Sequence, residues 1–180
     1  IQNGFYFASP FLPSYSERVS GNFGDISPNG IFTFENRNRQ VANFNGQNSH
    51  IAISNNINVG QYSVTVSAWI MPASSKNVNG PRDIQVPGNV FTPNKWYFIT
   101  GTYNGNYISI YVNGNKVNQS TVTGSINQPS GPTNIGSRND NSNNFFNGSI
   151  ANVQIYNTSL SGQQIQYLYQ EGIAGLPISN

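Results

Sequence analysis

Acidic side chains and histidine are the groups here that could do catalytic chemistry, and the chain has few of them. Its 180 residues include one histidine, His50, and six acids: Glu17, Asp25, Glu35, Asp83, Asp140 and Glu171. Retaining glycoside hydrolysis needs two carboxyl groups about 5–5.5 Å apart. No two of these acids alternate along one expected strand, and a single imidazole cannot form a histidine relay or a histidine-rich metal site. The sequence therefore predicts that the protein is not an enzyme.

A polar loop from Arg138 to Asn144 is the first candidate for a binding site. It holds one carboxylate among amides: Asn139, Asp140, Asn141, Asn143 and Asn144. Calcium takes six to eight oxygen ligands from carboxylates, amides and carbonyls, so Asp140 with these amides would suit a weak calcium site. The same amides could hydrogen-bond sugar hydroxyls, and an ordinary polar loop would have the same composition. Nothing in the sequence requires a cofactor.

Aromatic residues at turns form the second candidate site. Tyr103 and Tyr107 flank an Asn-Gly hairpin tip, and we expect both of them, with Phe91, to be exposed. Trp69 and Trp96 lie in the strongest strand patterns, which favours packing in the core over binding a ligand. Three triplets match the N-glycosylation pattern, at Asn118, Asn147 and Asn157. We expect Asn118 and Asn157 to be accessible and Asn147, which abuts a strand, to be less so.

The elements that would position these residues are nearly all strands. In Trp96–Val117 three apolar runs alternate with Asn104-Gly105 and Asn113-Gly114, the strongest short-range hairpin signal. Tyr62–Met71 alternates as a half-buried strand does. Further short strands are expected at Ile31–Phe34, Val41–Phe44, His50–Ser54, Thr133–Ser137 and Phe145–Tyr156. One helix is expected at Gln163–Glu171, with a capping box formed by Ser161 and Gln164 and a stop at Gly172. This pattern predicts an all-β antiparallel sandwich.

Composition excludes several classes of protein. Charged residues make up 8% of the chain, the net charge is +2, and about one residue in six is Asn. Without a basic stripe the chain should not bind nucleic acid, and without an apolar run of about 20 residues it should not insert into a membrane. A neutral, amide-rich surface suits an extracellular setting. The chain starts at Ile1, which favours a processed protein or a domain of a longer one.

An ordered set of motifs over residues 40–172 resembles one family. Val66–Pro72 is similar to a "TVSAWVKP" strand, and Ile110–Gly114 to "LYVDG". The other matching segments are Phe44–Gly46, Asn94–Tyr97, Gly101–Gly105, Ile135-Gly136, Phe146–Asn157 and Leu160–Tyr169. Together they resemble the laminin-G-like, concanavalin-A-like lectin/glucanase jelly rolls, as a non-catalytic member. The chain departs from the family at Ala151-Asn152, where an acidic pair is usual.

The resemblance implies one concanavalin-A-like domain over residues 1–180. Residues 1–40 would form an N-terminal arm with edge strands, and residues 41–172 the core. The expected function is extracellular recognition or adhesion, with a glycan or a cell-surface protein bound through the sandwich loops. The alternative is a structural domain at the surface of a virion, a pilus or a cell, which packs against identical or neighbouring subunits through the aromatic Phe5–Leu12 arm. Fold alone does not choose between them.

Overall fold

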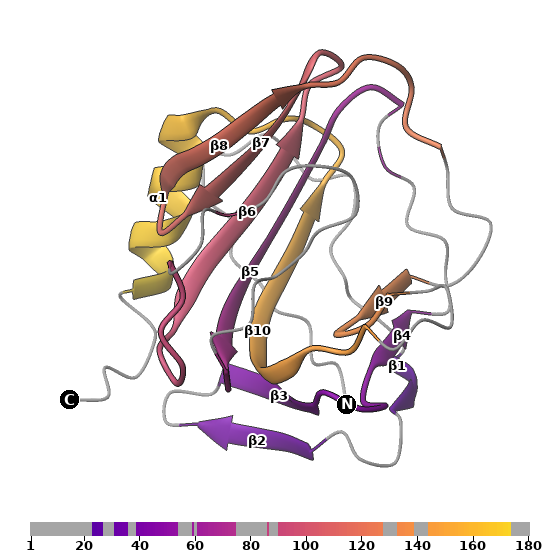
Figure 1. The fold of residues 1–180 in the computed structure, drawn as a ribbon, viewed down its shortest axis with the longest axis vertical. Coiled ribbons are helices and arrows are strands. Elements are labelled where there is room, and N and C mark those ends of the chain that lie inside the picture. The colour runs from indigo at the N-terminus through magenta and orange to yellow at the C-terminus, as the bar shows by residue number, and fades with distance from the viewer. Residues whose placement is uncertain are drawn as a thin grey trace.

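The protein is a two-sheet antiparallel sandwich with one helix (Figure 1). The computed structural model describes residues 23–26, 31–35, 39–53, 59, 61–74, 86, 90–127, 133–138 and 144–173. The larger sheet has the order β2-β3-β10-β5-β6-β7-β8 and the smaller one β1-β4-β9. The strands are β1 (Phe23–Ile26), β2 (Ile31–Glu35), β3 (Arg39–Asn45), β4 (Ile51–Ile53), β5 (Val64–Pro72), β6 (Tyr97–Tyr103), β7 (Tyr107–Val112), β8 (Asn115–Thr121), β9 (Thr133–Ile135) and β10 (Asn147–Tyr156). The predicted fold class is confirmed.

The predicted meander is β6-β7-β8, three consecutive antiparallel strands. Both connections contain the Asn-Gly pairs, with a positive φ of 90° at Gly105, 51° at Asn113 and 79° at Gly114. Asn and Gly adopt these left-handed conformations at low cost, whereas a β-branched residue would not. The local sequence therefore dictates where the chain reverses.

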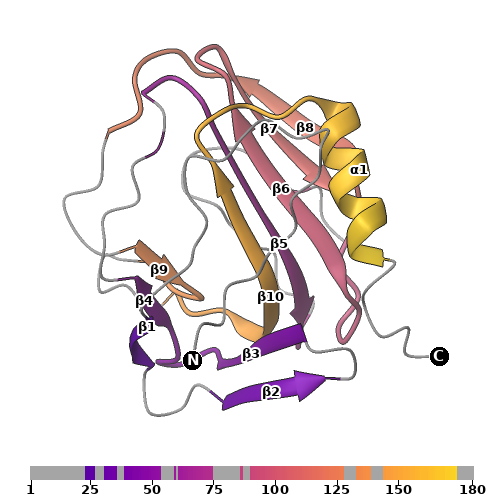
Figure 2. The same ribbon diagram turned by 180° about the vertical axis from the view of Figure 1, so that it is seen from behind.

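The seven-stranded sheet has one face under helix α1 (Gly162–Ile173), as the rear view shows (Figure 2). Alternation along β5 points Thr65, Ser67 and Trp69 to this face, where all three are buried. Trp69 packs with Phe98 at 5.3 Å and Tyr169 at 5.8 Å between ring centroids. Trp96 is partly buried against the same cluster. Both tryptophans thus belong to the core, as the strand pattern predicted.

Helix α1 begins where its capping box predicts. Ser161 Oγ accepts the N–H of Gln164 (3.3 Å), and Gln164 Oε1 accepts the N–H of Ser161 (2.9 Å). The predicted stop at Gly172 is wrong, because the helix continues through this residue to Ile173. A Cβ on Gly172 would lie 2.4 Å from Trp69 Nε1. Glycine is needed here because the helix approaches the indole closely.

The predicted aromatic arm, Phe5–Leu12, lies outside the described residues, so its packing stays a prediction. Within the described part, no helix is long and apolar enough to cross a membrane.

Candidate functional site

Three connections meet at one end of the large sheet, at the top of Figure 1. We call this surface the loop end and define it as Gln61–Ser63, Asn104–Tyr107 and Val122–Asn127. Backbone hydrogen bonds join the three segments: Ile126 N–H donates to Gln61 O (2.7 Å), and Val122 N–H donates to Asn106 O (2.9 Å). Within the β6–β7 turn, the Asn104 N–H donates to Tyr107 O (3.2 Å) and closes the turn. Segments distant in sequence are thereby fixed relative to one another.

Tyr103 holds the loop end together from below. Its hydroxyl lies within hydrogen-bond distance of Gly105 O (3.1 Å) and Gly124 O (2.5 Å), and the residue is only 8% exposed. The expectation that Tyr103 is exposed is therefore wrong. The ring turns inward, where its single hydroxyl proton can be donated to either carbonyl, of which Gly124 O is the nearer, as a buried tyrosine hydroxyl usually finds a partner. Tyr103 positions the loop end instead of presenting a surface to a ligand.

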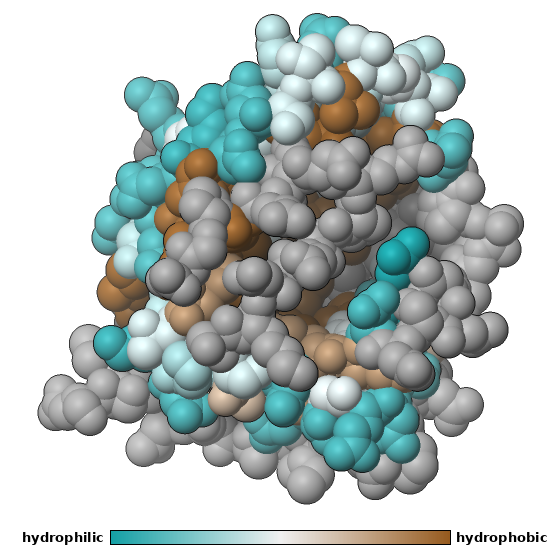
Figure 3. Space-filling view, in the orientation of Figure 1, coloured by the Kyte–Doolittle hydropathy of each residue, from teal (hydrophilic) through white to brown (hydrophobic). Residues whose placement is uncertain are grey.

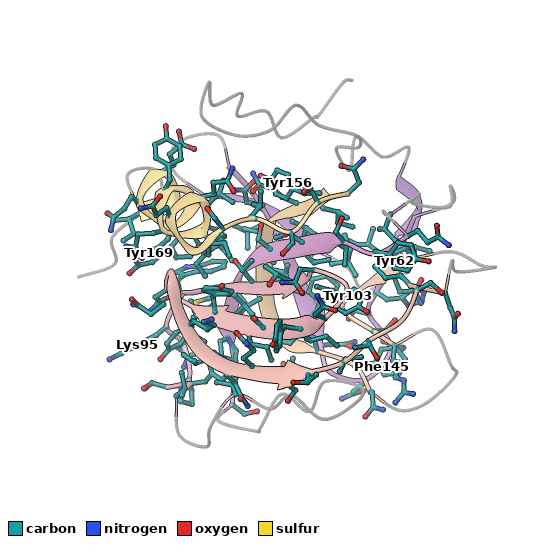
Figure 4. The ribbon with its side chains drawn as sticks, turned by 90° about the horizontal axis from the view of Figure 1, so that it is seen from above. Tyr62, Lys95, Tyr103, Phe145, Tyr156 and Tyr169 are labelled. Carbon is teal, nitrogen blue, oxygen red and sulfur yellow. The ribbon has the colours of Figure 1, made fainter. Side chains whose placement is uncertain are left out.

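The exposed aromatic residues at this end are Tyr62, 55% exposed, and Tyr107, 42% exposed. Tyr107 closes the β6–β7 turn, and Tyr62 lies against the same turn, because a Cβ on Gly105 would be 3.7 Å from Tyr62 Cβ. Figure 4 looks down on this end and shows Tyr62 beside Tyr103. Val122, 40% exposed, adds an aliphatic surface. Exposed apolar side chains grouped on a protein surface are typical of binding sites.

Neutral polar groups surround these rings. The exposed amides and hydroxyls of the loop end are Gln61, Asn104, Asn106, Thr123, Ser125 and Asn127. Polar surface lies beside hydrophobic surface at the top of the space-filling view (Figure 3). Asn104 Oδ1 accepts the N–H groups of Asn106 (3.1 Å) and Tyr107 (2.8 Å), which stiffens the turn. A rigid surface with two aromatic rings and many uncharged donors and acceptors can bind a polyhydroxylated ligand.

The described base of the predicted 138–144 loop is at the other end of the sheet. Its base is the bridge between Ser137 and Phe145, next to the start of β10. Gly148 of β10 pairs with Pro72, the last residue of β5, whereas Tyr103 pairs with Val64, the first residue. Eight residues of strand separate the two levels, about 26 Å. The described base of the 138–144 loop thus lies at the opposite end of the sheet from Tyr103 and Tyr107.

Of that loop, the structure describes Arg138 and Asn144. Asn144 is exposed, and its carbonyl oxygen accepts the N–H of Arg138 (3.3 Å). Asn139, Asp140, Asn141 and Asn143 lie outside the described residues. The residues that are described contain no group of three or more His, Cys, Asp or Glu side chains that would hold a metal ion.

The remaining candidates lie apart from both loops. Phe91 is half-buried with its ring edge-on to Tyr97, at 5.0 Å between centroids. His50 is half-buried, and its Nδ1 is 3.2 Å from Asn48 O. Asn157 is exposed as expected, but the order of the other two sequons is reversed: Asn147 is exposed, and Asn118 is half-buried inside β8. Asn118 lies in a strand because pairing continues past the hairpin to Thr121.

A row of hydroxyl groups lies buried beneath α1 and the segment that leads to it. Its members are Thr65, Ser67, Thr100, Thr102 and Ser109. Thr65 Oγ1 donates to Thr158 O (2.8 Å) and accepts the N–H of Leu160 (2.9 Å), which fastens that segment to β5. Burial raises the pKa of the neighbouring Tyr111 hydroxyl. The row stabilises the packing of the helix and is not accessible to a ligand.

Tyr62 is the most exposed aromatic ring among the described residues, and the sequence pattern does not predict it. The alternation at Tyr62–Met71 predicts a strand that starts at Tyr62, but β5 begins two residues later, at Val64. Gly60-Gln61 before the apolar run is a turn signal that places Tyr62 outside the strand.

Comparison with known proteins identifies the superfamily of this fold. The model of the concanavalin A-like lectin/glucanases superfamily, in its laminin G form, matches residues 73–166, just over half of the chain. The chain belongs to this superfamily, as its motifs predicted. No curated protein matches the chain.

Solved structures agree on the fold. Domain 4 of AbnA, an extracellular arabinanase from Geobacillus stearothermophilus solved in complex with arabinotriose, superposes with a TM-score of 0.63 at 15% identity, over 83% of this chain and 85% of that one. The heptameric SAP-like pentraxin from Limulus polyphemus gives 0.60 at 14% identity, over 72% and 81%. The binding domain of Paraclostridial Mosquitocidal Protein 1 gives 0.64 at 17% identity, over 86% of this chain and 49% of that one. This chain therefore spans about half the length of that binding domain.

Proposed function

We propose that the protein is a non-catalytic extracellular recognition module that binds a glycan through the loop end. The observation that carries this proposal is the pair of exposed rings, Tyr62 and Tyr107, on either side of one rigid turn. Tyrosine offers a large, flat apolar face at low cost in conformational entropy and dominates many recognition surfaces. The face of a sugar ring stacks on such a surface, while the surrounding amides bind its hydroxyls. One similar fold, domain 4 of the arabinanase, was solved with arabinotriose.

The placement of the acids supports the non-catalytic part of the proposal. Asp25 lies in β1 of the small sheet, Glu35 in β2 of the large sheet, and Glu171 in α1, where its Oε1 accepts the Tyr167 hydroxyl (2.7 Å). The described acids thus lie in three different elements, and no two of them alternate along one strand, the arrangement that would put a pair of carboxyl groups on one face of a sheet. Incubation with oligosaccharides should give no cleavage. Turnover that is lost when one of the six acids is replaced would contradict this part.

Binding to a glycan array, followed by calorimetry on the best ligand, tests the recognition part. We expect Tyr62→Ala and Tyr107→Ala each to weaken binding by about 1 kcal/mol, the value of one aromatic contact. Tyr167→Ala is the matched control, because it removes a tyrosine ring from α1, away from the loop end, and should leave the affinity unchanged. Wild-type protein that binds no glycan at all would refute the proposal.

The 138–144 loop is a second candidate surface of the same module. Asp140→Ala combined with Asn143→Ala would weaken binding by about 1–3 kcal/mol if this loop holds the ligand, because hydrogen bonds to a charged group are stronger than neutral ones. Loss of binding after calcium is removed with EDTA, and recovery when calcium is added, would assign a calcium role to Asp140. If only the tyrosine variants lose binding, the ligand is at the loop end.

A further inference from the structure

We propose that the loop end selects uncharged glycans and discriminates against sialylated, uronic or sulfated ones. This inference rests on the proposed function and specifies its ligand class. It is argued from where charge lies along the chain and across the sheet.

The loop end is built entirely from long uncharged stretches of the sequence. No Asp, Glu, Lys, Arg or His occurs from 51 to 75, from 96 to 115, from 117 to 137 or from 141 to 170. These stretches contain Gln61–Ser63, Asn104–Tyr107 and Val122–Asn127, and also Asn157, whose carbonyl oxygen accepts the Ser63 hydroxyl (3.1 Å). Strands β5, β6 and β7 are neutral along their full length, and the part of β8 that enters this end, from Val117 to Thr121, is neutral as well. Among the described residues, the charge-free region is therefore continuous across the sheet as well as in sequence.

The charges carried by the elements around α1 and the meander lie at the other end. Lys95 precedes the start of β6, and Lys116 pairs with Tyr111 next to the β7–β8 turn. Arg138 lies at the base of the 138–144 loop, and Glu171 lies beside Gly172, which contacts Trp69 in the lower half of β5. A ligand at the loop end meets amides and hydroxyls and no described cation.

An acidic sugar would bind poorly to such a surface. A carboxylate or sulfate that leaves water needs a cationic or multiply hydrogen-bonded partner, since desolvation of a charge is costly. Amide and hydroxyl groups match neutral sugar hydroxyls, because both sides offer donors and acceptors. With no charge at the contact, salt should neither screen nor steer the association. Selectivity for neutral glycans and insensitivity to salt therefore follow from the same feature.

The test compares matched glycan pairs on the full chain: a galactose-terminated oligosaccharide with the same molecule capped by sialic acid, and a neutral arabino-oligosaccharide with a uronic-acid oligosaccharide of equal length. We expect measurable affinity for the neutral member of at least one pair and at least about tenfold weaker binding of its acidic partner, as expected when a charge is left without a partner. The affinity should change by less than about twofold between about 50 and 500 mM NaCl.

A variant with one added charge tests whether the selectivity for neutral glycans arises at the loop end. Asn106 is exposed, and its hydrogen bonds with Val122 and Asn104 use its backbone atoms, so Asn106→Lys should fold normally. This variant should gain affinity for the acidic glycans and become sensitive to salt. Asn115→Lys is the matched control, because Asn115 is exposed at the opposite end of β8 and its replacement should leave selectivity unchanged.

The outcomes separate this inference from the proposed function. Equal or tighter binding of acidic glycans by the wild-type protein, or a shift in selectivity with Asn115→Lys instead of Asn106→Lys, overturns the inference and leaves glycan recognition standing. Absence of binding to every member of every pair overturns both. Neutral selectivity that is altered only by Asn106→Lys supports both.

Discussion

Replacing Gly172 by alanine tests the packing of α1 on the sheet. A Cβ at this position would lie 2.4 Å from Trp69 Cζ2 and Nε1 and 2.6 Å from Cε2. Real Cβ atoms do not approach other atoms so closely, so the helix or the indole must move. Trp69 is 3% exposed and packs in one cluster with Phe98 and Tyr169, which leaves it little room. Overpacking a core of this kind costs about 1–3 kcal/mol.

A second effect acts in the opposite direction. Alanine in place of glycine favours a helix by up to about 1 kcal/mol, and less near the end of the helix, where Gly172 lies. We therefore expect Gly172→Ala to lower the free energy of unfolding by about 1–2 kcal/mol. For a chain of this size the melting temperature should fall by about 2–8 °C. Thermal and urea denaturation followed by tryptophan fluorescence measure both quantities.

Gly162 provides a matched control in the same helix. A Cβ there would have only Tyr111 Cε1 nearby, at an ordinary contact distance of 3.9 Å. Gly162→Ala should leave stability unchanged or raise it by up to about 1 kcal/mol. Trp69→Phe removes the atoms that collide, so Gly172→Ala should cost less in that background, with a coupling energy of about 1 kcal/mol or more. If Gly172→Ala is as stable as the wild type, the close approach of helix and indole is wrong.

Four further predictions concern three side chains and the acids as a group. Burial raises the pKa of the Tyr111 hydroxyl in the folded protein, so the neutral hydroxyl contributes fully to stability below the unfolded pKa of 10.0, and this contribution is lost as the pH rises above that value. Tyr111→Phe should therefore reduce the fall in melting temperature between about pH 9 and 11. Tyr103→Phe removes the hydroxyl that joins two loops and should cost about 1 kcal/mol, with faster amide exchange at Val122–Asn127, whereas unchanged exchange would argue against the clamp. Thr100 Oγ1 is buried and has no hydrogen-bond partner in the described structure, so Thr100→Val should stabilise the protein by about 1 kcal/mol, and a loss of stability would show that the hydroxyl is satisfied. With six acids in the chain, the melting temperature should stay nearly flat between about pH 3 and 7, and a steep acid transition would reveal a paired carboxylate.

Local signals in the sequence predicted most of the fold. The Asn-Gly pairs specify reversals through their own backbone preferences, and the Ser161–Gln164 capping box specifies the first turn of the helix through contacts three residues apart. Such information is contained in a few adjacent residues. The strands and α1 therefore begin and end close to their predicted limits, and the ordered family motifs predicted the superfamily.

Properties that depend on distant residues were not predicted. Tyr103 is buried because its hydroxyl reaches a carbonyl 21 residues further along the chain, at Gly124. Gly172 resembled a helix stop because its neighbour across the helix–sheet interface, Trp69, is about a hundred residues away. The base of the 138–144 loop lies far from the β6–β7 turn because β5 and β10 run the length of the sheet between them. Sequence patterns predict which strand or helix holds each residue, whereas contacts between residues distant in sequence are seen only in the packed structure.

The turns of this protein are built from side-chain amides, and this makes the charge of the molecule adjustable. The Oδ1 atom of Asn45 accepts the N–H groups of Gln47, Asn48 and Ser49, that of Asn104 closes the β6–β7 turn, and that of Asn113 accepts the N–H of Phe98. A carboxylate oxygen accepts the same hydrogen bonds, and aspartate also tolerates the left-handed conformation of Asn113. Asparagine-to-aspartate replacements at these three positions would take the formal net charge from +2 to −1 (+2 − 3) while each turn keeps its acceptor. The isoelectric point of this sandwich can therefore be redesigned at these three turns without redesigning its fold.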